Sequence, residues 1–169
     1  MNQKLPIWDI HGEIISLLAI QNCLIIGAPT GSGKSTQVPQ MVVDDILCSK
    51  NKVIVLQPRR VAARSLARRV AFERSTSIGD GVGYQVRFEN HTSPTTMIEF
   101  VTEGILLRRL QNDPELKGVG AVLFDEFHER NILSDLALGL IKKLQKTKRQ
   151  ELKIIIMSAT IQTGSLASY

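Results

Sequence analysis

The chain contains four short, uninterrupted apolar runs, none of which alternates with polar residues. They lie at residues 23–26, 53–56, 121–124 and 154–157. Continuous apolar runs bounded by turn residues are typical of strands buried on both faces, as in a parallel sheet. Two further strands are expected at 79–90 and 97–102.

Segments with helical periodicity separate these runs. Apolar residues recur at intervals of three and four in 133–144, and 11–21, 35–47, 61–74 and 105–110 are also expected to be helical. The alternation of strands and helices predicts an α/β fold with an open, mostly parallel sheet and helices on both faces. A length of 169 residues suits a single domain spanning residues 1–169.

Composition adds modest constraints. The chain is 43% hydrophobic and 22% charged, an ordinary balance for a soluble globular domain. Its formal net charge of +5 permits an anionic partner such as nucleic acid or nucleotide. We expect a cytoplasmic protein without membrane association, because no secretory signal and no bilayer-spanning apolar stretch is visible. Cys23 and Cys48 lack metal-ligand spacing and are expected to be buried free thiols.

The strongest chemical signal is a glycine-rich loop between a predicted strand and a predicted helix. Glycines let the backbone N–H groups curl around phosphates, and a helix N-terminus favours their charge. Lys34 is expected to reach the β- and γ-phosphates, and Ser35 to ligate Mg²⁺. A chance glycine-rich turn before a lysine is the alternative. The expected nucleotide-binding residues are Ala28, Pro29, Thr30, Gly31, Ser32, Gly33, Lys34, Ser35 and Thr36, with Ala28 standing where the strict pattern has glycine.

A second candidate site follows the apolar run 121–124, where the sequence reads Asp-Glu-Phe-His at 125–128. Acidic residues there would face the same sheet edge as the glycine-rich loop. Asp125 is expected to hold Mg²⁺, directly or through water. Glu126 is expected to orient and deprotonate the attacking water, and is also a candidate metal ligand. The alternative is a solvated acidic turn.

Three weaker signals also lie at predicted strand ends. Arg59-Arg60 precedes an arginine-dense helix whose charges could simply be solvated, but the strand-end position favours phosphate contact. Thr102-Glu103-Gly104 and Ser158-Ala159-Thr160 could merely cap helices. His11 and His91 have no identifiable partners and are expected to be surface residues.

Taken in order, these motifs resemble those of the DEAH-type RNA helicases of superfamily 2, most closely the bacterial HrpB type. The resemblance runs over nearly the whole chain. Phe127 replaces the alanine of the DEAH motif, a variant that resembles HrpB-type proteins. The matching segments are Ala-Pro-Thr-Gly-Ser-Gly-Lys-Ser-Thr at 28–36, Gln-Pro-Arg-Arg-Val-Ala-Ala at 57–63, Val-Gly-Tyr-Gln-Val-Arg-Phe at 82–88, Thr-Glu-Gly at 102–104, Asp-Glu-Phe-His-Glu-Arg at 125–130 and Met-Ser-Ala-Thr at 157–160.

The resemblance implies a RecA-like P-loop NTPase domain that uses ATP and Mg²⁺. It also implies that Arg59 and Arg60, together with Thr102 and Gly104, contact the backbone of single-stranded RNA or DNA. Arg69 would stack on the adenine of the nucleotide.

Further roles implied by the resemblance concern coupling. Ser158 and Thr160 would link hydrolysis to strand movement, and His128 would join them by contacting the γ-phosphate side or another lobe. The family's motor has a second RecA-like lobe that supplies arginine fingers, and no Gln-x-x-Gly-Arg motif of such a lobe occurs in this sequence.

Three functions therefore remain open at this point. The chain is expected to be the first motor lobe of a helicase, with the second lobe as its partner. A nucleotide-binding module without remodelling activity and another P-loop phosphotransferase, such as a small-molecule kinase, are the alternatives. A kinase would need a lid and an acceptor site, and the sequence shows neither.

Overall fold

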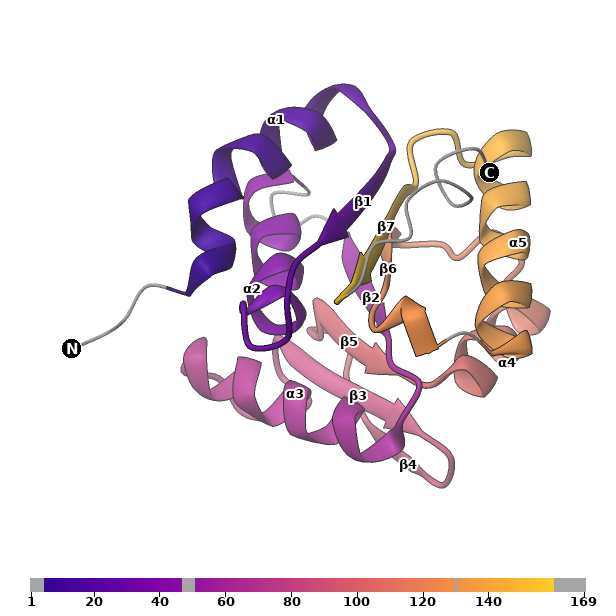
Figure 1. Ribbon diagram of the computed structural model, residues 1–169. Coiled ribbons are helices and arrows are strands. Elements are labelled where there is room, and N and C mark those ends of the chain that lie inside the picture. The colour runs from indigo at the N-terminus through magenta and orange to yellow at the C-terminus, as the bar shows by residue number, and fades with distance from the viewer. Residues whose placement is uncertain (1–4, 47–50, 130, 160–169) are drawn as a thin grey trace.

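The computed structural model describes residues 5–46, 51–129 and 131–159. These residues form one seven-stranded sheet in the order β1-β7-β6-β2-β5-β3-β4 (Figure 1). All strand pairs are parallel except β3–β4. The strands are β1 (Cys23–Gly27), β2 (Lys52–Leu56), β3 (Val82–Val86), β4 (Glu89–His91), β5 (Ile98–Val101), β6 (Val119–Phe124) and β7 (Lys153–Ser158).

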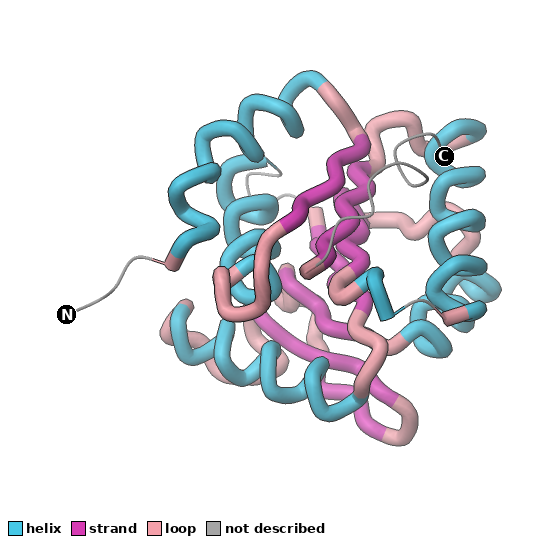
Figure 2. Tube along the Cα trace, viewed as in Figure 1, coloured by secondary structure: helices cyan, strands magenta, loops and turns pink. Residues whose placement is uncertain are grey.

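Helices cover both faces of the sheet (Figures 1 and 2). The described residues also form three short helical turns: η1 (Pro6–Ile10), η2 (Val42–Ile46) and η3 (Phe127–Glu129). The predicted α/β class, with its mostly parallel sheet, is confirmed. The longer helices are α1 (His11–Ile20), α2 (Lys34–Met41), α3 (Arg60–Glu73), α4 (Glu103–Asn112) and α5 (Ile132–Thr147).

Alternate residues of the central strands enter two separate cores. In β2, Val53 and Val55 pack with residues of α1, α2 and α3, whereas Ile54 and Leu56 pack with residues of α4 and α5. Both faces are therefore apolar, which explains why the strands read as continuous apolar runs in the sequence. Because the strands that precede the motifs are parallel, the β-to-α connections that carry most of the predicted site residues lie at one edge of the sheet.

The predicted strand at 79–90 is wrong in one respect. The structure divides this segment into β3 and β4, which pair antiparallel through a tight turn at Arg87 and Phe88. Phe88 has φ of 70°, a left-handed conformation that reverses the chain and that ordinary residues seldom adopt.

Three smaller expectations also need correction or fall outside the described residues. Cys23 is only half-buried, because β1 is an edge strand, and Cys48 lies outside the described residues. His11 has a partner after all, since its Nε2 lies 2.9 Å from Oδ2 of Asp45. The His91 ring stands 4.8 Å from the Tyr84 ring, centroid to centroid.

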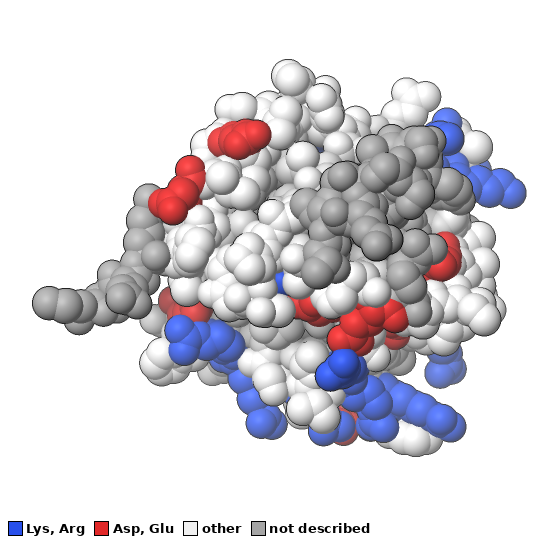
Figure 3. Space-filling model, in the orientation of Figure 1, with Lys and Arg blue, Asp and Glu red and all other residues white. Residues whose placement is uncertain are grey.

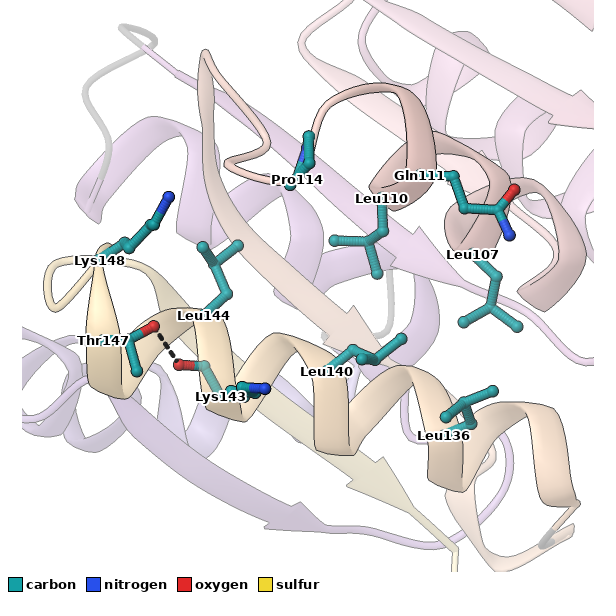
Figure 4. Close-up of a pocket in the computed structure, with 10 residues that line it drawn as sticks. All are labelled: Leu107, Leu110, Gln111, Pro114, Leu136, Leu140, Lys143, Leu144, Thr147 and Lys148. Carbon is teal, nitrogen blue, oxygen red and sulfur yellow. Dashed lines mark hydrogen bonds between the residues drawn. The ribbon is translucent and has the colours of Figure 1, made fainter.

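A groove of about 470 Å³ lies between α4 and α5 (Figure 4). Its walls are mainly leucines, including Leu107 and Leu110 from α4 and Leu136 and Leu140 from α5. None of its lining residues belongs to the predicted sites. Within the described part of the chain, no helix is long and apolar enough to span a membrane.

Candidate functional site

The glycine-rich loop connects β1 to α2 and has the tight curvature that the sequence predicts. Gly31 and Gly33 have φ of 80° and 93°, in the left-handed region that favours glycine. A Cβ added to Gly33 would also lie only 2.8 Å from Cδ1 of Leu5. Both conformation and space therefore require glycine immediately before the N-terminus of α2.

This loop borders a hollow of about 320 Å³ whose size and lining suit a small anionic ligand. Lys34 and Thr36 line it from α2, and Arg69 lines it from α3. The Ser32 hydroxyl is buried and has no hydrogen-bond partner within the described residues. Burying a polar atom without a partner costs free energy, so a ligand that forms a hydrogen bond with the Ser32 hydroxyl would stabilise the loop.

Asp125 connects the loop to the acidic residues. It follows β6 and is 4% exposed. Nε2 of Gln57 and the backbone N–H of Glu126 donate hydrogen bonds to its carboxylate, and the Ser35 side chain lies near enough to lower its pKa. Burial raises the pKa of the Asp125 carboxyl above its ordinary value, although these hydrogen bonds oppose the shift. No role was predicted for Gln57, which follows β2 and is itself buried.

Lys34 and Glu126 form the second link between the two motifs. Nζ of Lys34 lies 3.3 Å from Oε1 of Glu126, and the Lys34 side chain is only 3% exposed. Glu126 adopts φ of 49°, an unusual value for a residue other than glycine. This backbone conformation turns the chain sharply after Asp125, and the Glu126 side chain lines the same hollow as the phosphate loop.

The oxygen donors present fit Mg²⁺, which retains several waters and needs few protein ligands when substrate phosphates supply the rest. Ser35 and Asp125 offer one hydroxyl and one carboxylate, and Ser35 lies near enough to lower the pKa of the Asp125 carboxyl. Glu126 instead contacts Lys34 and His128. Among the described residues there is no cluster of three or more His, Cys, Asp or Glu that could hold a metal without such a substrate.

The residues expected to act in coupling lie beside this hollow. Nδ1 of His128 is 3.4 Å from Oε2 of Glu126 and 3.5 Å from the backbone nitrogen of Ala159. Ser158 ends β7, and its carbonyl accepts a 3.1 Å hydrogen bond from the backbone N–H of Ala28. Thr160 lies outside the described residues. His128 therefore contacts both the acidic motif and the end of β7.

Arg69 is anchored to its own helix. Its Nε donates a 2.6 Å hydrogen bond to Oε1 of Glu73, one turn later in α3. Oε2 of Glu73 accepts from Nε2 of Gln37 and of Gln40, both on α2. Burial opposes the ionisation of Glu73, but hydrogen bonds from Arg69, Gln37 and Gln40 outweigh it and lower the pKa of the carboxyl. The helix that begins at the phosphate loop is thereby joined to Arg69.

Arg59 and Thr102 lie after neighbouring parallel strands. Leu56 of β2 is in register with Val101 of β5, and the next backbone N–H, that of Gln57, donates to the Val101 carbonyl. The segments that follow, Arg59-Arg60 and Thr102-Glu103-Gly104, therefore leave the same edge of the sheet. The suggestion that Thr102 caps a helix is only half right: it is the N-cap of α4, but its side chain makes no capping hydrogen bond.

Basic side chains lie around this edge next to acidic ones (Figure 3). The Arg59 side chain is 72% exposed and pairs with Glu129. Nη2 of Arg60 donates to the Arg87 carbonyl at 2.9 Å, which ties α3 to the β3–β4 turn. A Cβ placed on Gly104 would meet no atom within 4 Å, so the backbone there is accessible.

Phe88 is a feature of this face that the sequence analysis missed. Its ring is 86% exposed at the β3–β4 turn, and the Arg87 guanidinium lies 4.7 Å from the ring centroid. An exposed phenylalanine beside arginines offers a flat stacking surface. Phe88 ends the matching segment 82–88, but no role was expected for it because it lay within a segment predicted to be a continuous strand.

A phosphate loop joined to an acidic motif, at the carboxyl edge of a mostly parallel sheet, defines the RecA-like class of ATP-binding domain. The sequence also matches the model of the DEAD/DEAH box helicase family over residues 8–167. The chain belongs to this family, which confirms the resemblance seen in its motifs.

Individual relatives give a consistent picture. The chain is 41% identical to the probable ATP-dependent RNA helicase DHR2 of Saccharomyces cerevisiae, with all of the chain and 23% of that protein aligned. It is 44% identical to the ATP-dependent RNA helicase HrpB of Escherichia coli, with 96% of the chain and 20% of HrpB aligned.

Solved structures agree with these relatives. A crystal structure of the E. coli DEAH/RHA helicase HrpB superposes with a TM-score of 0.91 at 43% identity, covering 98% of this chain and 21% of that one. The chain thus spans about a fifth of the length of the relatives it matches.

Proposed function

We propose that this chain is the ATP-binding lobe of a nucleic-acid-dependent helicase, a single domain over residues 1–169 that works with a second RecA-like lobe. The observation that carries the proposal is the pair formed by Lys34 of the phosphate loop and Glu126 of the acidic motif, whose Nζ and Oε1 atoms lie 3.3 Å apart. This pair brings together the phosphate-binding and water-orienting groups that phosphoryl transfer needs. Family membership argues against a small-molecule kinase.

In this proposal each residue of the hollow has a defined task. Backbone N–H groups of residues 28–36 cradle the phosphates, with Lys34 at the β- and γ-phosphates. Ser35 and Asp125 hold Mg²⁺, which supplies charge neutralisation on the phosphate oxygens. Glu126 orients the attacking water and accepts its proton. Arg69 stacks on the adenine, in the position where Glu73 holds it.

His128 and Ser158, with Thr160, pass the state of the nucleotide on to strand movement. His128 is suited to this task because Nδ1 lies within reach of both Glu126 and the Ala159 backbone. A change of position in Glu126 would alter both contacts of the imidazole. The proposed coupling therefore begins at the group that faces the γ-phosphate.

The proposed nucleic-acid surface consists of Arg59, Arg60, Thr102 and Gly104, and it contacts the backbone of single-stranded RNA or DNA. Exposure of Arg59 and the open backbone at Gly104 support this assignment. Phe88 adds a stacking surface for a base. Phe88→Ala should weaken binding of single-stranded RNA without changing its salt dependence, because stacking releases no counterions. An altered salt dependence would contradict the stacking role.

ATP turnover tests the proposal as a whole. Turnover should be low for this chain alone and should rise when the second lobe is present and single-stranded RNA is added. If RNA leaves the turnover of the two-lobe protein unchanged, the chain is a nucleotide-binding module and has no role in remodelling nucleic acid.

A further inference from the structure

Arg59, the residue proposed to grip the nucleic-acid backbone, is already bound to an acidic side chain of the same domain. Its Nη2 lies 2.7 Å from Oε1 of Glu129. The two residues are far apart in sequence, since Arg59 follows β2 and Glu129 ends the short turn η3 after the acidic motif. Acidic and basic atoms lie side by side on this face of the molecule (Figure 3).

The pair stands apart from the other ion pairs around it. Arg60 and Arg64 both lie near Glu89 of β4, and Nη2 of Arg60 also donates to a backbone carbonyl. Among the residues that the structure describes, Arg59 pairs with Glu129 alone, and its side chain is 72% exposed against 31% for Glu129. An incoming strand can therefore reach the guanidinium, while the carboxylate is partly held by the domain.

A carboxylate and a phosphate present the same kind of oxygen pair to a guanidinium fork. Glu129 and a backbone phosphate would compete for Nη2 of Arg59, and the negative charge of Glu129 would oppose a phosphate placed beside it. We infer that Glu129 occupies the place of a nucleic-acid phosphate on Arg59 and is displaced when a single strand binds. This inference rests on the proposed function of Arg59.

Displacement of Glu129 from Arg59 would affect the nucleotide site, because Glu129 is hydrogen-bonded to Glu126. The backbone N–H of Glu129 donates a 2.9 Å hydrogen bond to the carbonyl of Glu126, the residue proposed to orient water. Glu126 in turn contacts Lys34. A strand that binds Arg59 would therefore remove a side-chain restraint on the turn that begins at Glu126.

A second contact joins the same region to the other proposed strand-binding segment. Oε1 of the buried Glu103, between Thr102 and Gly104, accepts hydrogen bonds from Nδ2 of Asn131 and Oγ of Ser134, each at 3.1 Å. Asn131 and Ser134 begin α5, just beyond Glu129. Both proposed strand-binding segments thus meet residues directly downstream of the acidic motif, and only the Arg59 contact is exposed enough to exchange.

The test is a binding titration on this chain with fluorescein-labelled oligouridylate as the probe. Glu129→Gln should tighten binding, because the strand no longer has to displace a charged competitor. An exposed ion pair of this kind corresponds to a gain of about 1.5- to 5-fold in affinity. In an Arg59→Ala background the same substitution should give no gain, since the two residues act on each other. Glu129→Ala, a smaller side chain, should reproduce the gain.

Glu115→Gln is the matched control. This substitution removes one negative charge from another exposed ion pair, the one that Glu115 forms with Lys148. Glu115 precedes β6 and therefore lies at the opposite edge of the sheet from Glu129. A gain for Glu129→Gln no larger than that of Glu115→Gln, or one that persists without Arg59, would overturn the inference while leaving the proposed function intact. Absence of oligouridylate binding by the unmodified chain would overturn both.

Discussion

Nζ of the buried Lys34 lies 3.3 Å from Oε1 of Glu126, so the phosphate loop and the acidic motif are joined by a charged pair. Without nucleotide, each charge serves as the partner of the other in a region with little solvent. A γ-phosphate would bring additional negative charge to Lys34 and leave Glu126 available to a water molecule. In the proposed mechanism the pair would therefore make the availability of Glu126 to water depend on nucleotide binding.

Lys34→Ala should weaken the binding of ADP with Mg²⁺. Loss of a charge-assisted contact to the phosphates costs roughly 1.5–3 kcal/mol, or about tenfold to a hundredfold in affinity. Calorimetry measures this directly, with Lys146→Ala, an exposed lysine on α5, as the control. Equal affinities for both variants would remove Lys34 from the nucleotide site.

Glu126→Gln should leave nucleotide binding nearly unchanged and abolish ATP turnover in the protein with both lobes, because an amide can neither orient nor deprotonate the water in the same way. Asp125→Asn should behave differently and weaken the Mg²⁺-dependent part of binding. Steady-state turnover and calorimetry on the two variants separate the roles. Near-normal turnover by Glu126→Gln would rule out its role with the water.

Simultaneous substitution of Arg59 and Arg60 by alanine should lower the affinity for single-stranded RNA and flatten its salt dependence. Each phosphate contact that is lost removes about one unit from the slope of log affinity against log salt concentration, so a change of about one to two units is expected. Anisotropy titrations at several salt concentrations measure the slope. An unchanged slope would mean that these arginines are simply solvated.

Acid stability should depend on Glu73. Its hydrogen bonds with Arg69, Gln37 and Gln40 place the pKa of the folded state below the ordinary value of 4.5. Ionised Glu73 therefore stabilises the fold above pH 4.5, and this contribution disappears as the pH falls through the folded-state pKa.

Glu73→Gln should accordingly be less stable at neutral pH, by about 1 kcal/mol, and should lose less stability on acidification. Urea unfolding at a series of pH values measures both effects. Parallel pH profiles for the variant and the unmodified chain would show that this carboxylate contributes nothing to acid stability.

This chain on its own should hydrolyse ATP slowly and should not unwind a duplex. An arginine finger supplied from elsewhere contributes about 10³–10⁵ in rate to related P-loop enzymes, and we expect the proposed second lobe to supply such a residue. Unwinding also needs two lobes that change their separation. Adding the second lobe, in cis or in trans, should restore both activities, and robust unwinding by the isolated monomer would contradict this mechanism.

Local sequence determined the chemistry of this protein to a large extent. The phosphate loop could be read directly, because the positive φ of Gly31 and Gly33 demands glycine and leaves a recognisable pattern. Strands β2, β6 and β7 were equally clear, since burial on both faces produces continuous apolar runs, and the half-buried edge strand β1 has a similar run. The order of the motifs then identified the family.

Which side chains meet across strands depends on the three-dimensional fold and could not be predicted from the sequence. No local pattern links Gln57 to Asp125, Arg59 to Glu129 or Glu103 to Asn131, because each pair is brought together by sheet order and register. The turn at Phe88 could not be predicted from the sequence for a related reason. Antiparallel pairing of β3 with β4 imposes a left-handed backbone on Phe88, a conformation that phenylalanine does not favour. Sequence fixes which groups are available, and long-range packing determines their partners.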